Sequence, residues 1–327
     1  MKRLFQKVFI FISLFGGELL FSENVAGDLR QMGRPKPPTF LDFLFQPKFL
    51  VMLGIGLIAL ILLKTRTMKK GRKMTLLLIS TFLFGFAGNI PARFFHSFIM
   101  HPSPICAATK SILYGFGIPL IVTLAVIFFL TLIGPKLFCG YVCPVGTSQE
   151  LIAMLSDRLK IKRGHTNFTL AYGVRLGIFL LFVFVSGTAI LNTVVDGVTY
   201  PLSLYDYFNP FHGMELGPDP NLLGYAIHYL PFLLTLIFAF KYYRPFCHFV
   251  CPVGLYTHFI EQFSLFRVTL DKKTCSDCNT CLKDYPCSAI PEIMKEATLR
   301  PDCFACGVCT QDCVQKSFSI GICRTKN

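Results

Sequence analysis

The chain has 327 residues, of which 53% are hydrophobic, with 35 phenylalanines and no tryptophan. This composition excludes an ordinary soluble domain and indicates a membrane protein. The net charge of +14 does not indicate binding to nucleic acid, because the lysines and arginines stand in short clusters beside apolar runs, where they orient a chain in a membrane.

Six apolar stretches are candidates for crossing a bilayer. The first, residues 4–21, follows Lys2 and Arg3, so we expect a first span or signal-anchor over 1–22 and an outer segment over 23–48. The other stretches are 49–63, 74–91, 112–134, 170–193 and 222–240. With five or six spans, the sequence predicts a polytopic α-helical membrane protein whose helical domain covers residues 49–262.

The charges between the stretches predict the orientation. Six basic residues lie between Lys64 and Lys73 and five between Lys136 and Arg163, whereas residues 194–221 contain none. The positive-inside rule places the two basic loops, and the tail from Arg244 onward, in the cytoplasm of a bacterium, with the protein in its inner membrane. Because the cytoplasm is reducing, a structural disulfide framework is not expected among the cysteines placed there, which are all of the fourteen except Cys106, and metal or redox chemistry is expected instead.

The same dithiol pattern, Cys-x3-Cys-Pro-Val-Gly, occurs twice, each time shortly after an apolar stretch. The first copy carries Cys139 and Cys143, and the second carries Cys247 and Cys251. Cysteines four positions apart lie on one face of a helix, and the proline that follows ends or turns that helix. After the first copy, residues 147–150 (Thr-Ser-Gln-Glu) have the form of a capping box, so we expect a new helix there that runs along the surface.

The repetition indicates an internal duplication of a span followed by a dithiol corner. Three interpretations of the four thiols remain open. They converge on a third metal or iron-sulfur centre at the membrane face, they act as two redox-active pairs, or they are small buried packing residues. Sequence spacing alone does not show whether the pairs meet in space.

The tail over residues 263–327 is the one long stretch that is not apolar, and it holds nine of the cysteines. Two triplets there have two residues between successive cysteines: Cys275, Cys278 and Cys281, and Cys303, Cys306 and Cys309. Such a triplet supplies three thiolates to one face of an iron-sulfur cube and leaves one iron to a cysteine from elsewhere. Two zinc sites are the alternative, but zinc sites usually divide their cysteines into separated pairs.

This spacing resembles the bacterial two-cluster ferredoxin module. The resemblance implies a small cytoplasmic α+β domain with two 4Fe-4S clusters, each completed by a cysteine that follows the other triplet. The implied ligands are Cys275, Cys278, Cys281 and Cys313 for the first cluster, and Cys303, Cys306, Cys309 and Cys287 for the second.

Spans that end twice in Cys-x3-Cys-Pro, followed by such a tail, resemble the NapH/MauN group of membrane ferredoxin-type proteins, related more distantly to the C-terminal part of NosR and to CcoG-type proteins. The resemblance implies an electron carrier or oxidoreductase subunit, rather than a stand-alone enzyme, that passes electrons between the quinol pool or a soluble carrier and a partner oxidoreductase. An assembly factor that reduces copper or thiols on a client metalloenzyme is the alternative, and a cluster-bearing sensor is a third hypothesis.

Several single residues carry weaker hypotheses. Cys106, near His96 and His101 in an outer loop, is a candidate for copper, although a buried loop cysteine is the commoner outcome. His228 in the last span is a candidate haem ligand, and interfacial hydrogen bonding is its default role. Arg175, near the inner end of a span, is expected to snorkel to the interface. Cys323 is expected to be an ordinary thiol.

Overall fold

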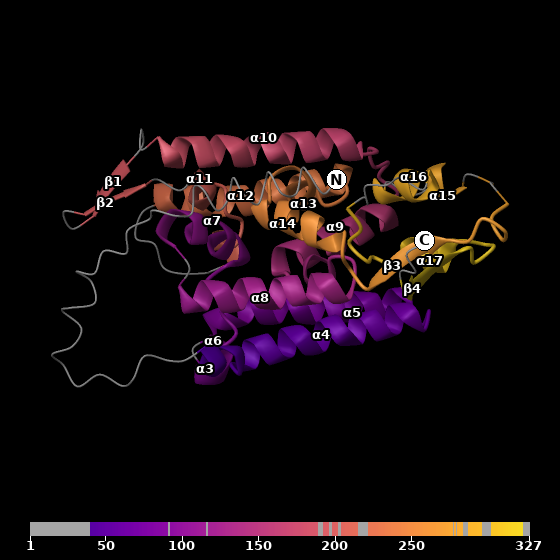
Figure 1. The fold of residues 1–327 in the computed structure, drawn as a ribbon, viewed down its shortest axis with the longest axis horizontal. Helices are drawn as coiled ribbons and strands as arrows, with labels where there is room; N and C mark the ends of the chain where they lie inside the picture. The colour runs from indigo at the N-terminus through magenta and orange to yellow at the C-terminus, as the bar shows by residue number, and fades with distance from the viewer. Residues whose placement is uncertain are drawn as a thin grey trace.

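The computed structural model describes residues 40–90, 92–115, 117–188, 192–195, 198–201, 204–214, 222–276, 278, 280–283, 287–295 and 302–322. These residues form an elongated, mostly helical molecule with a small mixed domain at one end (Figure 1). The predicted first span, residues 4–21, and Cys323 lie outside the described residues.

The first helices form an antiparallel pair. The short α3 (Phe40–Leu44) leads into α4 (Pro47–Lys64), which begins with proline, a residue well suited to a first helical turn. The chain turns at Arg66, whose φ of 56° is left-handed, and returns as α5 (Lys70–Thr81). The stretch predicted over 74–91 then continues as a π-helix, η2 (Phe82–Phe86), and a 3-10 turn, η3 (Ala87–Asn89).

The stretch predicted as one span over 112–134 is divided in the structure. The short α6 (Arg93–His96) precedes α7 (Pro104–Tyr114), and a separate helix, α8 (Ile118–Ile133), follows. Gly115 separates α7 from α8 with a φ of 81°, which a side chain would rarely permit. The prediction that the span begins at 112 is therefore wrong, because hydropathy does not register a local break of this kind.

The third part of the helical domain contains a strand pair that the sequence did not indicate. Helix α10 (Phe168–Gly187) leads to β1 (Asn192–Val195), which pairs antiparallel with β2 (Val198–Pro201). The short α11 (Leu204–Tyr207) and the 3-10 turn η5 (His212–Met214) follow. Helix α12 (Leu222–Lys241) then runs back and contains Pro231.

Both Cys-x3-Cys-Pro copies form hairpins that point into the helical domain. The first is built from the π-helix η4 (Phe138–Val142) and α9 (Pro144–Arg158), and the second from α13 (Pro245–Phe249) and α14 (Pro252–Glu261). The Cys-Pro turn of the first lies deep, because a Cβ atom on Gly85 of η2 would come within 3.4 Å of Pro144.

The predicted capping box after the first copy is wrong. Helix α9 already begins at Pro144, with Cys143 as its N-cap residue, so Thr147 and Glu150 are helical rather than capping. The first turns of α9 are buried and pack against α5 and α12 instead of running along the surface. The proline at the first helical position sets the start of the helix before the capping sequence is reached.

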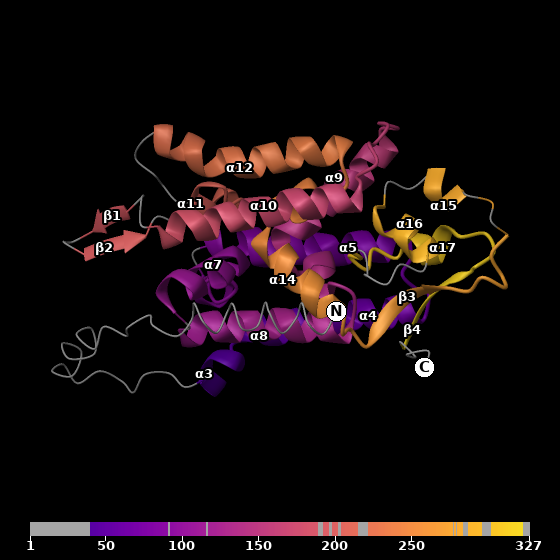
Figure 2. The same ribbon diagram turned by 45° about the horizontal axis from the view of Figure 1, so that its top comes forward.

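The C-terminal domain is a small α+β unit. Strand β3 (Phe266–Leu270) pairs antiparallel with β4 (Phe318–Ile322), with Phe266 opposite Ile322 and Leu270 opposite Phe318. Between them the chain forms three short helices, α15 (Thr280–Lys283), α16 (Ala289–Met294) and α17 (Val308–Asp312). These elements gather at one end of the molecule, and β1 and β2 lie at the other, in both views (Figures 1 and 2).

The outer faces of the long helices are apolar. On α10, Leu180, Leu181 and Phe184 are 56%, 56% and 62% exposed, and exposed apolar surface of this kind indicates contact with lipid or protein. Among the described residues, α4 and α10 are long and apolar enough to cross a membrane, while α8 and the Tyr229–Lys241 part of α12 are shorter apolar helices. The expected number of five or six spans stays a prediction.

Candidate functional site

The two Cys-x3-Cys-Pro hairpins bring their four thiols together inside the helical domain. Cys139, Cys143 and Cys247 are buried and Cys251 is half-buried. Burial raises the pKa of the Cys143 thiol, and the charges of the other three thiols raise it further. Burial and the charges of Cys247 and Cys139 also raise the pKa of the Cys251 thiol. Burial and the charge of Cys247 raise the pKa of the Cys139 thiol to about 12. Each thiol therefore lies within electrostatic reach of the other three.

Each hairpin is held by a buried guanidinium group. Nη1 of Arg244 donates a hydrogen bond to the carbonyl oxygen of Cys139 at 2.6 Å, and Nη1 of Arg175 donates to that of Cys247 at 3.1 Å. Arg175 is 0% exposed, so the expectation that it snorkels to the interface is wrong. Its charge is used inside the protein, where it orients the second hairpin and pairs with an acidic residue of the tail.

Glycine is required where each hairpin turns. A Cβ atom on Gly146 would lie 2.3 Å from the carbonyl oxygen of Cys139, and one on Gly254 would lie 2.8 Å from that of Cys247. Real Cβ atoms do not approach oxygen this closely, so both turns exclude any side chain. The repeated glycine of the sequence motif thus has a steric cause.

A buried acidic residue balances the charges beside the first hairpin. Glu150 accepts from Lys73 at 2.5 Å, from Nε of Arg244 at 2.8 Å and from the Tyr243 hydroxyl at 2.7 Å. Burial alone would raise the pKa of Glu150, but Lys73 and Arg244 outweigh it and hold the pKa well below its usual range. Glu150 therefore remains a carboxylate in the protein interior.

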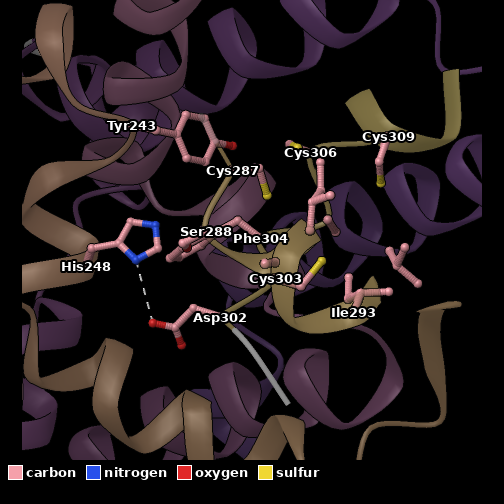
Figure 3. A pocket seen from close by; sticks show the side chains of 15 residues that line it. Tyr243, His248, Cys287, Ser288, Ile293, Asp302, Cys303, Phe304, Cys306 and Cys309 are labelled. Carbon is pink, nitrogen blue, oxygen red and sulfur yellow. Dashed lines mark ion pairs between the residues drawn. The ribbon is translucent and has the colours of Figure 1, made fainter. Parts of the chain in front are cut away.

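Beside the second hairpin the balancing carboxylate comes from the tail. Asp302 pairs with Lys136 and, at 3.0 Å, with Nη2 of Arg175. Nδ1 of His258 lies 3.1 Å from the same carboxylate. Nδ1 of His248 lies 3.7 Å from it, as Figure 3 shows. Burial opposes ionisation of Asp302, yet Lys136 and Arg175 outweigh burial and hold its pKa well below the usual range.

Four tail cysteines surround one cavity next to Asp302. The cavity is lined by Cys287, Cys303, Cys306 and Cys309, together with Tyr243 and His248 of the helical domain (Figure 3). Burial raises the pKa of the Cys303 thiol, and the charges of Glu261 and of the other three cysteines raise it further. The loop is compact because Ala305 and Gly307 adopt left-handed φ angles of 50° and 77°.

The other four tail cysteines form a separate group nearer solvent. Burial raises the pKa of the Cys281 thiol, and the charges of Cys278, Cys275 and Cys313 add to that effect. Cys278 is exposed and the other three are half-buried. Cys281 thus interacts with Cys275, Cys278 and Cys313, and Cys303 interacts with Cys287, Cys306 and Cys309; that these two groups bind clusters stays a prediction.

In the part of the chain that the structure describes, none of the cysteine groups has three sulfurs as close together as the ligands of one zinc ion. Four sulfurs bound tetrahedrally at about 2.3 Å to zinc are only ~3.8 Å apart. Among the described residues, no three cysteine sulfurs lie within 4.8 Å of one another, and the group that meets this distance is His258, Glu261 and Asp302. Lys136 contacts the Asp302 carboxylate of this group. Because the lysine neutralises that carboxylate, His258, Glu261 and Asp302 form a poor binding site for a metal ion.

The weaker hypotheses from the sequence fare differently. Cys106 lies in α7, where its N–H donates to the Ser103 hydroxyl at 3.2 Å, and it forms no three-ligand group of metal-site size with His96 and His101. Its sulfur lies 3.9 Å from the Asn209 amide instead. The side chain of His228 lies outside the described residues, so its role stays a prediction.

A basic residue repeated in the sequence indicates where the buried charges lie. Lys136 and Arg244 occupy the same position, three residues before the first cysteine of each copy. Both adopt a left-handed backbone, with φ of 42° and 47°, and both are almost fully buried. A basic residue repeated at one position of a duplicated motif is better explained by a shared internal partner than by the membrane surface.

Comparison with protein families finds the 4Fe-4S binding domain twice, over residues 116–162 and 227–272. The two matches contain the two Cys-x3-Cys-Pro hairpins and end before the tail cysteines. The sequence duplication is therefore a duplication of a domain whose relatives bind iron-sulfur clusters.

Several curated proteins are similar to this chain over about half to two thirds of its length. The ferredoxin-type protein NapH of Haemophilus influenzae is 26% identical over 59% of this chain and 64% of its own. An uncharacterized protein of Methanocaldococcus jannaschii is 30% identical over 64% of this chain and 82% of its own. The methylamine utilization ferredoxin-type protein MauN of Paracoccus denitrificans is 28% identical over 48% of this chain and 50% of its own. No solved structure matches the chain.

Proposed function

Because the chain belongs to the family of ferredoxin-type 4Fe-4S proteins that includes NapH and MauN, we propose that it is a membrane-anchored protein that relays single electrons by means of three iron-sulfur clusters. The observation that carries the proposal is the gathering of twelve cysteines into three sets of four. The buried set is Cys139, Cys143, Cys247 and Cys251; the inner tail set is Cys287, Cys303, Cys306 and Cys309; the outer tail set is Cys275, Cys278, Cys281 and Cys313.

The donor atoms of each set fit a 4Fe-4S cluster, which is held by four cysteine thiolates and gains or loses one electron at a time when bound. Each set supplies four thiols, spaced more widely than one metal ion requires. The inner tail set also surrounds a cavity. The protein's own contribution is to ligate through thiolates, to exclude water from the buried set and to place charges beside it.

The charges around the buried set favour a metal centre over the other two interpretations. Burial raises the pKa of the Cys247 thiol, while Arg244, Lys136 and Arg175 act in the opposite direction and favour its thiolate. Gln149 also donates to the Cys247 sulfur at 3.3 Å. Small packing residues need no such cations, and a buried pair of dithiols would be out of reach of a client protein.

The orientation that we propose puts the clusters on the cytoplasmic side of a bacterial inner membrane. The basic loops after α4 and α8 lie at the end of the molecule that carries the tail (Figure 1), and basic loops face the cytoplasm. Electrons would pass between a quinol or a soluble carrier and a partner oxidoreductase. The burial of Cys139 and Cys247 disfavours the alternative, an assembly factor that reduces thiols on a client.

Iron content tests this function. Protein purified without oxygen should contain about twelve iron atoms, and the variant with Ser at Cys139, Cys143, Cys247 and Cys251 should contain about eight. The variant Cys306→Ala should lose the reduced-state EPR signal of the inner tail set and keep that of the outer set. Colourless wild-type protein that contains zinc would refute the proposal.

The membrane orientation and the alternative role as an assembly factor are tested separately. A reporter fused after residue 327 should be active in the cytoplasm, and its export would refute the orientation. Gene neighbours that encode a reductase support the relay, whereas copper-export or oxidase genes support the assembly role.

A further inference from the structure

Residues 302–306 of the tail, which we call the wedge segment, are inserted between the two hairpins. The Tyr141 hydroxyl donates to the carbonyl oxygen of Ala305 at 3.0 Å. Gly140 lies so close that a Cβ atom there would be 2.4 Å from the carbonyl oxygen of Phe304. Both Gly140 and Tyr141 stand between the two cysteines of the first hairpin, so the backbone of the wedge segment contacts the loop that carries two thiols of the buried set.

The ring of Phe304 is enclosed by residues of both hairpins. Nζ of Lys136 lies 5.1 Å from the centre of the ring, and the guanidinium carbon of Arg244 lies 5.0 Å from it. The ring of His248, inside the second motif, meets it edge-on at 5.0 Å. Cations held over an aromatic face are attracted to it, most strongly where water is excluded. Phe304 therefore fixes the distance between Cys303 and the two hairpins.

The wedge segment also completes the charge balance of the helical domain. Beside the first hairpin, Glu150 of the same domain neutralises Lys73 and Arg244. Beside the second hairpin, Lys136 and Arg175 are both 0% exposed, and the carboxylate between them is Asp302 of the tail. The backbone N–H of Cys303 is held in turn by Glu261 of α14 at 3.2 Å.

We infer that the wedge segment locks the buried set and the inner tail set into one rigid electron-exchange unit, with Gly140 and Phe304 as its positioning residues. The inference rests on the proposed function. The clusters that these two sets would hold would exchange one electron at a time, one cluster being oxidised as the other is reduced, with no bond formed or broken. The outer tail set, with its exposed Cys278, is then the terminal that meets a soluble partner.

The variant Gly140→Ala tests this inference in the full-length, iron-loaded protein. The new methyl group must push the wedge segment away, because its neighbour is backbone rather than a flexible side chain. Gly177→Ala on α10 is the matched control, since nothing lies within 4 Å of its Cβ position. The measurements are iron content, spin-spin coupling between reduced centres by EPR, the rate of exchange after reduction by a viologen radical, and protease cleavage near residue 302.

We expect Gly140→Ala to keep its iron but to show weaker spin-spin coupling, severalfold slower exchange and faster cleavage, with Gly177→Ala like the wild type. Phe304→Leu leaves the backbone contact free of strain and should show the same changes in coupling and exchange. If Gly140→Ala does not fold, the coupling and exchange rate of Phe304→Leu test the inference in its place. Loaded variants with wild-type coupling, exchange and cleavage would overturn the inference.

Failure of the proposed function gives a different result. A content of about eight irons in the wild-type protein would show that the buried set holds no cluster. Protease cleavage would then still test the wedge segment, since its contacts with Gly140 and Tyr141 need no metal.

Discussion

The replacement Asp302→Asn removes the negative charge between Lys136 and Arg175 while it keeps the size of the side chain. Asp302 is 2% exposed, and both cations are 0% exposed. Glu261 is the remaining carboxylate near Lys136, at 4.0 Å. The variant therefore leaves two buried cations with one distant partner and breaks the ion pairs that Asp302 makes between the tail and the helical domain.

Breaking a buried ion pair by removal of one partner costs about 3–5 kcal/mol. Because about 1.4 kcal/mol corresponds to a tenfold change in an equilibrium constant, the undocked population of the tail should rise by about a hundredfold or more. Asp157→Asn is a suitable control, because Asp157 pairs with Arg163 at 2.5 Å but its side chain is 47% exposed. Exposed pairs contribute about 0–1 kcal/mol.

Hydrogen exchange of the peptide that covers residues 302–322 measures this population directly. The peptide should lose protection in Asp302→Asn and keep it in Asp157→Asn, with iron content determined first in both. Equal protection in the two variants would show that Asp302 does not hold the tail and that the charge argument is wrong.

Two further predictions concern the helical domain. Gly146→Ala should fail to form the buried set, because its Cβ would lie 2.3 Å from a motif carbonyl oxygen, and it should therefore lose about four irons relative to the Gly177→Ala control; full iron content would contradict the steric argument. Glu150 has a folded pKa below its usual value, which is about 4.3 when unfolded. Its stabilisation is thus present above that pH and is lost as the pH falls through the folded pKa. Glu150→Gln should be less stable at pH 7 and should show a flatter acid limb in thermal unfolding; parallel curves would refute this assignment.

Much of the candidate site could be predicted from the sequence. The triplets of the tail and the two Cys-x3-Cys-Pro copies are visible because cluster ligands in one loop have fixed spacing along the chain. The partition of loops by charge is visible because it depends on composition rather than on contacts. The resemblance to the NapH/MauN group followed from these local patterns, and the family comparison confirmed it.

The break between α7 and α8 and the true start of α9 were not predicted. Hydropathy averages over a window, so a left-handed Gly115 or a proline at the first position of a helix changes the element without changing the average. The capping-box prediction at Thr147 failed for the same reason, since a local pattern was applied to a segment whose ends are set by packing.

The sequence by itself identified the cysteines that we propose as cluster ligands, because the residue type and the spacing of such ligands can be seen along the chain. Only the tertiary structure decided that the four motif thiols meet, that Arg175 is buried, and that Asp302 completes the second hairpin. These contacts join residues far apart in sequence, and their energies depend on burial and on the positions of opposite charges. That information exists only once the helices have packed.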